Sequence, residues 1–200
     1  MSRIVDRGAI SAAYVGIGMA VTIAVSFLLV IPIEPIYWLL AIPAGLLIGY
    51  YANQRSDRRA GPWSRIVTNA LFAGLVTGLT LAVLLLAVKA LFFFADSGYP
   101  TFNRLDEDGK AMAPFCEPGA GCVYARYLEA GSTAEFEAAG VTDVASFTGL
   151  YWSQQASTAG ALVLVTTGGA LLGGLAYGAT RPKPEARVQA GTYASDTPGK

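Results

Sequence analysis

The stretch Asn53–Arg65, NQRSDRRAGPWSR, decides how this chain is arranged, because it is a short basic segment between two long apolar runs. Its single acid, Asp57, is outnumbered by four arginines: Arg55, Arg58, Arg59 and Arg65. Lysine and arginine close to membrane spans are retained in the cytoplasm, so such a segment fixes the orientation of its neighbours. We therefore expect residues 53–65 to form a cytoplasmic loop between two membrane-spanning helices.

Charge is sorted along the rest of the chain in the same way. The chain has 200 residues, of which 54% are hydrophobic and 14% charged, and its net charge is zero. Ten of the 14 basic residues lie in the N-terminal tail, in the 53–65 loop or after Thr180. Residues 96–154 instead hold nine acids and three basic residues. This separation of a basic side from an acidic side excludes an ordinary soluble protein and indicates a membrane protein.

Four apolar runs are candidates for membrane spans. An α-helix rises 1.5 Å per residue, so about 20 residues cross a hydrocarbon core of ~30 Å. The sequence thus predicts an all-α integral membrane protein with four transmembrane helices and both termini in the cytoplasm. The predicted spans are Ile10–Ile31, Ile36–Tyr51, Ile66–Phe94 and Ala156–Ala179.

A cleaved signal peptide is the alternative interpretation of the first span, because Arg3 and Arg7 precede an apolar run. That run is long for a signal peptide, and no A-x-A-like cleavage site follows it before Pro32. We therefore expect a retained helix that forms a tight hairpin with the second span.

Tyrosine and tryptophan gather at membrane interfaces, and the aromatic residues agree with the predicted depths. Those expected at the outer interface are Tyr37, Trp38, Phe92, Phe93, Phe94, Tyr151 and Trp152. Those expected at the inner interface are Tyr50, Tyr51, Trp63 and Tyr177.

Two charged residues lie close to the outer ends of the predicted spans. Glu34 is expected at the tip of the first hairpin, as a solvated turn residue or, alternatively, as a proton-handling group. Lys89 is the one charge in the third span, roughly 35 Å along the helix from Ile66. We expect its ammonium group to extend past Phe92–Phe94 to the lipid headgroups. The alternative is a buried cation in a transport path.

The predicted extracytoplasmic segment, residues 96–154, contains the only two cysteines, Cys116 and Cys122. On the oxidising side of the membrane such a pair is expected to form a disulfide. Two thiols without histidine make only half a metal site, and redox-active pairs usually have two intervening residues rather than five.

Helix signals follow the cysteines in this segment. Ser132 and Glu135 fit a capping box at the start of a short helix that Gly140 would end. Thr142–Asp143 is a candidate start for another helix that leads towards Tyr151. We expect residues 96–154 to form a cap on the membrane face, and residues 181–200 to form a flexible cytoplasmic tail.

Several classes of function are disfavoured by the residues present. The chain contains no histidine, which excludes a Ser-His-Asp triad, histidine-ligated haem and a histidine zinc site within this chain. It also lacks a G-x-x-x-x-G-K-[ST] phosphate loop. We therefore expect no enzyme activity, no catalytic, cofactor-binding or metal-binding residues, and no nucleic-acid partner.

Small residues recur at four-residue spacing in the spans, where they allow helix backbones to approach closely. Two such stripes occur on the fourth span, of which one is expected to face inward and the other a neighbouring subunit. Alternatively, both stripes pack within the chain's own bundle. The glycines predicted to form helix-packing interfaces are Gly45, Gly49, Gly74, Gly78, Gly169, Gly173, Gly174 and Gly178.

Two functions fit this pattern. The first is a non-catalytic accessory subunit of a larger complex in a bacterial cytoplasmic membrane, with other integral membrane subunits and lipids as its partners. The alternative is a small oligomeric transporter or channel that uses Glu34, Lys89 and the threonines within the spans.

Overall fold

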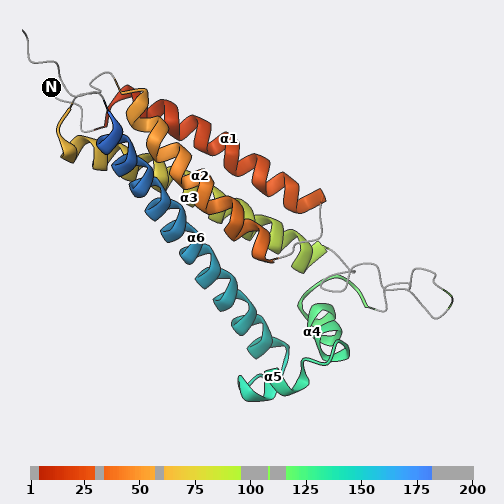
Figure 1. Ribbon diagram of the computed structural model, residues 1–200. Helices are drawn as coiled ribbons and strands as arrows, with labels where there is room; N and C mark the ends of the chain where they lie inside the picture. Colours follow the sequence, from red (N-terminus) through yellow and green to blue (C-terminus); the bar gives the residue numbers. More distant parts are fainter. Residues whose placement is uncertain (1–4, 30–33, 57–60, 96–107, 109–115, 182–200) are drawn as a thin grey trace, which may run out of the picture.

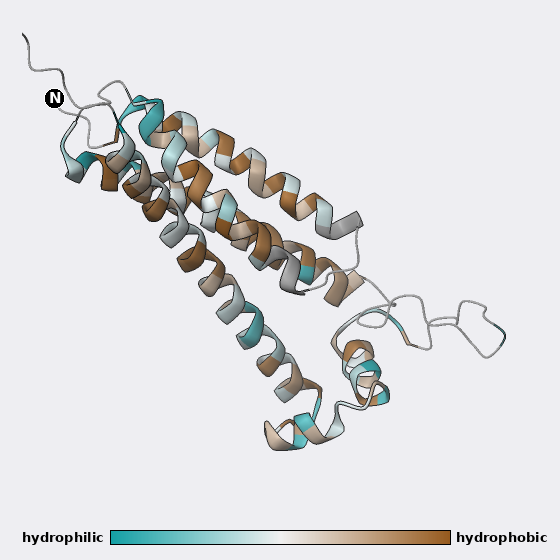
Figure 2. Ribbon diagram, in the orientation of Figure 1, coloured by the Kyte–Doolittle hydropathy of each residue, from teal (hydrophilic) through white to brown (hydrophobic). Residues whose placement is uncertain are grey.

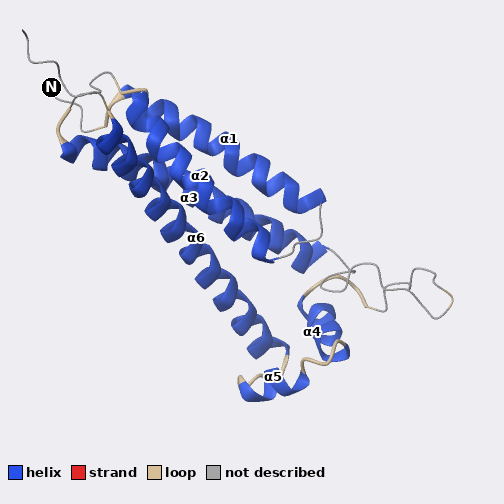
Figure 3. Cartoon of the chain, viewed as in Figure 1, coloured by secondary structure: helices blue, strands red, loops and turns tan. Residues whose placement is uncertain are grey.

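The computed structural model describes residues 5–29, 34–56, 61–95, 108 and 116–181, and every regular element within them is an α-helix (Figures 1 and 3). Four long helices run side by side, and two short helices lie at one end of the fourth. The long helices are α1 (Arg7–Leu29), α2 (Glu34–Gln54), α3 (Trp63–Ala95) and α6 (Val144–Thr180). The short ones are α4 (Ala120–Glu129) and α5 (Thr133–Ala138).

Three segments of these helices are long and apolar enough to cross a bilayer, which indicates a membrane protein. They are Arg7–Ser26 in α1, Trp63–Ala95 in α3 and Val144–Thr180 in α6. Figure 2 shows hydrophobic residues along the long helices and hydrophilic residues towards the N-terminal end of α1 and around α4 and α5.

Helix α6 packs against both α2 and α3, and α1 packs against α3 and α2 from the other side. The middle of the bundle is filled by Leu81 and Leu85 of α3 and Leu162 of α6. These side chains interdigitate with Ala20 of α1 and Ala41 of α2. Helix α2 continues through Pro43, whose missing amide hydrogen leaves one carbonyl of the preceding turn without its helical partner.

Glycines hold α6 directly against the backbone of α2. A Cβ atom at Gly49 would overlap the carbonyl oxygen of Ala170, and one at Gly173 would overlap that of Leu46. Gly45 meets the Thr166 carbonyl in the same way. Because even a methyl group has no room here, the two helices approach as closely as their backbones allow.

The other glycine stripe of α6 faces α3. Gly174 lies against the Ala70 side chain, and Gly178 lies under the ring of Trp63. From the α3 side, a Cβ atom at Gly78 would lie 3.1 Å from the Cα atom of Val163. Both stripes are therefore occupied by this chain's own helices, and neither is left for a neighbouring subunit.

Helix α6 is longer than the predicted fourth span because it begins at Val144 rather than near Ala156. Asp143 caps it, since its carboxylate accepts from the Ser146 amide at 2.7 Å while the Ser146 hydroxyl accepts from the Asp143 amide. Residues 144–154, predicted as part of a separate cap, instead belong to the same helix as the span.

The capping box predicted at Ser132 is wrong, although α5 does begin at the next residue. Ser132 has φ −76° and ψ 10°, whereas an N-cap residue needs extended backbone to turn its hydroxyl towards the third amide of the helix. Gly140 does follow the end of α5, with φ 72°, a left-handed conformation that glycine adopts without strain.

We predict that Gly173→Ala lowers the free energy of unfolding by about 1–3 kcal/mol, because the added methyl group forces α6 away from Leu46. Reversible unfolding in mixed detergent micelles measures this change. Gly168→Ala is the matched control on the same helix, since a Cβ atom there has no neighbour within 4 Å. Equal stability of the two variants would contradict the close backbone contact.

Candidate functional site

The end of the bundle opposite Arg7, which we call the outer end, carries an aromatic cluster that joins α3, α4, α5 and α6. We call it the aromatic cap, defined by Phe93, Val123, Phe136, Val141, Phe147 and Tyr151, all of which are buried. Phe93 is fully buried, and its ring centroid lies 4.6 Å from that of Tyr151 and 5.4 Å from that of Trp152. Phe147 of α6 connects it to Phe136 of α5, at 5.3 Å. The short helices are thus fixed to the membrane bundle by ring packing.

The aromatic residues predicted at this depth differ in their exposure. Phe93 and Tyr151 are 0% and 4% exposed and belong to the aromatic cap. Phe94, in contrast, is 57% exposed and stacks on Trp152, with 6.0 Å between the ring centroids.

Cys116 and Cys122 lie at disulfide-bonding distance, with their Cα atoms 5.3 Å apart, as the sequence predicted. Cys122 lies in the first turn of α4 and is 5% exposed, next to the buried Val123. The bond ties the residues before α4 to the aromatic cap.

The surface of this region is acidic. Within residues 108 and 116–143, every exposed charged side chain is a carboxylate, whereas the one basic residue, Arg126, is only 4% exposed. The exposed acids are Asp108, Glu117, Glu129, Glu135, Glu137 and Asp143.

A buried polar cluster around Asp6 closes the opposite end of the bundle. Asp6 caps α1 by accepting from the Gly8 amide at 2.7 Å, and it also accepts from the Ser56 hydroxyl. Its second carboxylate oxygen lies 3.3 Å from the amide nitrogen of Asn69 in α3. One carboxylate therefore links the start of α1, the end of α2 and the first turns of α3.

Two further contacts support this polar end. Asn53 of α2, 1% exposed, donates to the Ile66 carbonyl at 3.2 Å and so joins α2 to α3. Arg181, just after α6, donates to the Gly61 carbonyl, and its guanidinium lies 5.6 Å from the centre of the Trp63 ring. Each of the four long helices is thus tied to this end by a polar contact.

The two predicted interfacial charges have different outcomes. Lys89 is 7% exposed and lies on the buried face of α3, so the prediction that its ammonium extends to the headgroups is wrong. Lys89 follows Leu85 and precedes Phe93 at four-residue spacing, so the three side chains share one face of α3, and that face is buried. Glu34 is the first residue of α2, and its side chain lies outside the described part of the structure.

Other predictions also lie outside the described residues. These are the 182–200 tail, the acidic turn at residues 96–107, and Asp57, Arg58 and Arg59 of the basic loop. The structure therefore leaves them as predictions.

Sequence reasoning missed the Asp6 cluster. Asp6 was not identified from the sequence, although aspartate directly before an apolar run is a helix N-cap signal. Asn69 was likewise overlooked, although an amide within a membrane span normally marks a polar contact.

Comparison with protein-family models, with curated proteins and with solved structures finds no match for this chain. Among the described residues, no group of three or more histidine, cysteine, aspartate or glutamate side chains is placed to hold a metal ion. The candidate functional surfaces of the described chain are the exposed acids of residues 108 and 116–143, which we call the acidic cap, and the lateral faces of the long helices.

We predict that Asp6→Ala lowers the free energy of unfolding by about 2–4 kcal/mol, measured by detergent-micelle unfolding. The change removes a helix cap, at about 0.5–2 kcal/mol, and also takes the acceptor from the buried Ser56 and Asn69. Asp143→Ala is the matched control, since it removes an exposed helix cap alone. If both variants lose the same stability, the buried links of Asp6 contribute nothing.

We also predict that the Asp143 carboxyl titrates below its ordinary pKa of 3.8, because the Ser146 amide and hydroxyl donate to its ionised form. A lowered pKa in the folded state stabilises the fold above pH 3.8, and this stabilisation is lost as the pH falls through the lowered value. An NMR titration measures the midpoint, which Ser146→Ala should raise towards 3.8. A midpoint at or above that value in the unmodified chain contradicts the assignment.

Proposed function

We propose that this chain is a non-catalytic accessory subunit of a larger protein complex in a bacterial cytoplasmic membrane. In this proposal α1, α2, α3 and α6 each cross the bilayer, with both termini in the cytoplasm. The fold supports this orientation, since Arg7, Arg55, Arg65 and Arg181 belong to helix ends at one end of the bundle (Figure 1). The acidic cap belongs to the other end, as the retention of basic residues in the cytoplasm requires.

The observation that carries the proposal is the closed interior of the bundle. Close contacts at glycines hold α6 against α2 and α3, from Gly45 and Gly78 near the middle to Gly178, under the Trp63 ring, at the basic end. A transport path needs a polar, hydrated interior, whereas backbone contacts, alanine and leucine fill the middle of this bundle. Its buried threonines Thr77 and Thr166 lie within the close helix contacts at Gly16 and Gly78. Such a bundle offers its outside to partner helices and leaves no path for a substrate or ion through its middle.

The outward surfaces offer places for partners to pack. Gly160 and Gly168 on the outer face of α6 have no neighbour within 4 Å of an added Cβ atom, and Leu164 between them is 74% exposed. The two glycines leave room on either side of the exposed leucine for side chains of a second transmembrane helix. The rigid acidic cap adds a surface for an extracytoplasmic domain of the same complex.

A small oligomeric transporter or channel is the second candidate, and the burial of Lys89 is the observation that favours it. Ionisable residues buried within membrane helices frequently line substrate or ion pathways.

The test is purification of the tagged chain from native membranes in a mild detergent, followed by mass determination of the intact assembly. We expect larger membrane subunits at fixed stoichiometry. Replacing Gly160 and Gly168 together by leucine should lower their recovery by about five-fold or more, which corresponds to roughly 1 kcal/mol of association energy. Gly18→Leu is the matched control, since Gly18 is also open but lies on α1.

A chain that emerges alone contradicts the accessory function. A homo-oligomer whose reconstituted flux is lost in Lys89→Ala, with its assembly intact, would favour the transporter instead.

A further inference from the structure

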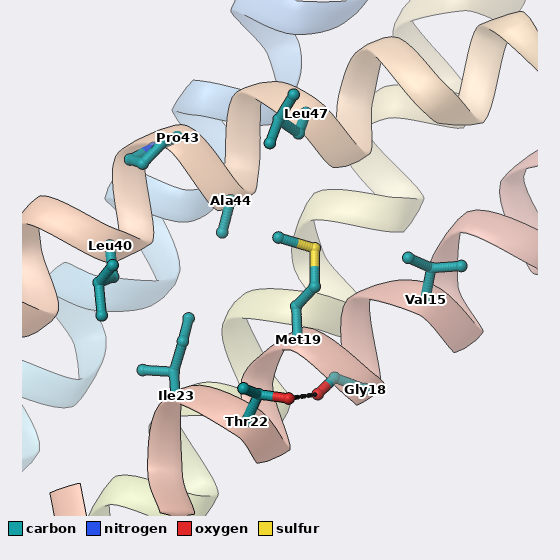
Figure 4. Close-up of a pocket in the computed structure, with 9 residues that line it drawn as sticks. All are labelled: Val15, Gly18, Met19, Thr22, Ile23, Leu40, Pro43, Ala44 and Leu47. Atoms are coloured by element: carbon teal, nitrogen blue, oxygen red, sulfur yellow. Dashed lines mark hydrogen bonds between the residues drawn. The ribbon is translucent and has the colours of Figure 1, made fainter. Parts of the chain in front are cut away.

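The outer surface of the bundle contains an apolar groove between α1 and α2, with a volume of about 470 Å³ (Figure 4). It lies at the middle of both helices. Its walls include Val15, Met19 and Ile23 of α1 and Leu40, Pro43 and Leu47 of α2.

The groove exists because α1 and α2 touch at one end and leave space further along. At the basic end, Gly8 lies directly against the backbone of Ala52 and Arg55, and Ala9 and Ala12 pack with Ile48. Ten residues further along α1 than Gly8, Gly18 has no atom within 4 Å of an added Cβ. The missing side chain leaves the groove open towards the surroundings.

The lining selects a hydrocarbon occupant. Its one side-chain hydroxyl, that of Thr22, donates to the Gly18 carbonyl at 3.0 Å within α1 (Figure 4). No lining side chain therefore needs a polar partner, and a polar ligand would lose its hydrogen bonds to water without replacement. A flexible apolar chain fills such a groove at no comparable cost.

Basic residues mark one end of the same two helices. Arg7 is the first residue of α1 and Arg55 follows the last residue of α2, and both are exposed. The Arg55 side chain donates to the Tyr51 hydroxyl at 3.2 Å and lies 5.6 Å from the centre of that ring. Since Tyr51 is four residues beyond Leu47, this contact holds Arg55 over the groove side of α2.

The distance from these arginines to the groove matches the dimensions of one lipid leaflet. At 1.5 Å per residue, the groove begins about 12 Å from Arg7 and Arg55 and ends about 24 Å from them. A leaflet has about 15 Å of hydrocarbon beneath a headgroup layer of roughly 5–7 Å. A lipid phosphate at the arginines therefore brings the distal half of its acyl chain into the groove.

We propose that this groove binds one acyl chain of an anionic phospholipid whose headgroup contacts Arg7 and Arg55. The site belongs to the leaflet at the basic end of the bundle. It is independent of the accessory function, because it requires no other protein.

The test is native mass spectrometry of the full chain released from nanodiscs that contain phosphatidylglycerol and phosphatidylcholine. We expect one retained lipid, predominantly phosphatidylglycerol. Gly18→Phe should lower lipid retention by about five-fold or more, because the ring occupies the groove. Gly149→Phe, equally open but on α6, is the matched control and should retain lipid as the unmodified chain does.

The headgroup contact is tested separately by Arg7→Gln combined with Arg55→Gln. We expect the preference for phosphatidylglycerol over phosphatidylcholine to fall by roughly five-fold for each arginine, with phosphatidylcholine retention unchanged. Leu47→Trp is a second groove-filling variant, and loss of lipid in both Gly18→Phe and Leu47→Trp would support the site.

Three results would overturn the proposal. The first is retention in Gly18→Phe and Leu47→Trp equal to that of the unmodified chain. The second is retention of the two lipids without preference. The third is a dimer that holds no lipid and dissociates in Gly18→Phe, since a second copy would then occupy the groove.

Discussion

The close contact between the α6 backbone and those of α2 and α3 is the constraint on which this structure depends. Hydrocarbon offers no hydrophobic drive for helix association, so the bundle must be held by close packing and by a few polar contacts. Gly49 and Gly173 supply the packing on the α2 side, and Gly174 and Gly178 supply it on the α3 side. Asp6 and Asn53 then fix the relative heights of the helices at the basic end.

The two ends of the bundle are closed by different physical means. A single buried carboxylate with its amide and hydroxyl donors closes the basic end, whereas the outer end is closed by rings that pack around Phe93. Hydrogen bonds fix register through direction, while aromatic packing fills volume and excludes water. Neither kind of contact fills the space between α1 and α2 at the middle of the bundle, and the apolar groove lies there.

The helical class, three of the four apolar spans and the cysteine pair could be predicted from the sequence because each rests on a local pattern. The continuity of α6 from Asp143 was missed because a polar stretch at residues 153–157 resembles a boundary when membrane thickness alone is considered. The burial of Phe93 depends on its packing against Phe147, Tyr151 and Trp152 of α6, which no local pattern encodes. The Asp6 cluster joins residues 50 and 63 positions apart and required the fold to be seen.

The unbroken length of α6 has a mechanical consequence. Its 37 residues span about 55 Å, well beyond the ~30 Å of a hydrocarbon core, and they carry the aromatic cap at one end and the Arg181–Trp63 contact at the other. Because α6 is continuous and contributes Phe147 and Tyr151 to the aromatic cap, there is no hinge between the helix and the cap. Any tilt of the aromatic cap would therefore be passed along α6 to Gly169 and Gly173, where this helix packs on the α2 backbone.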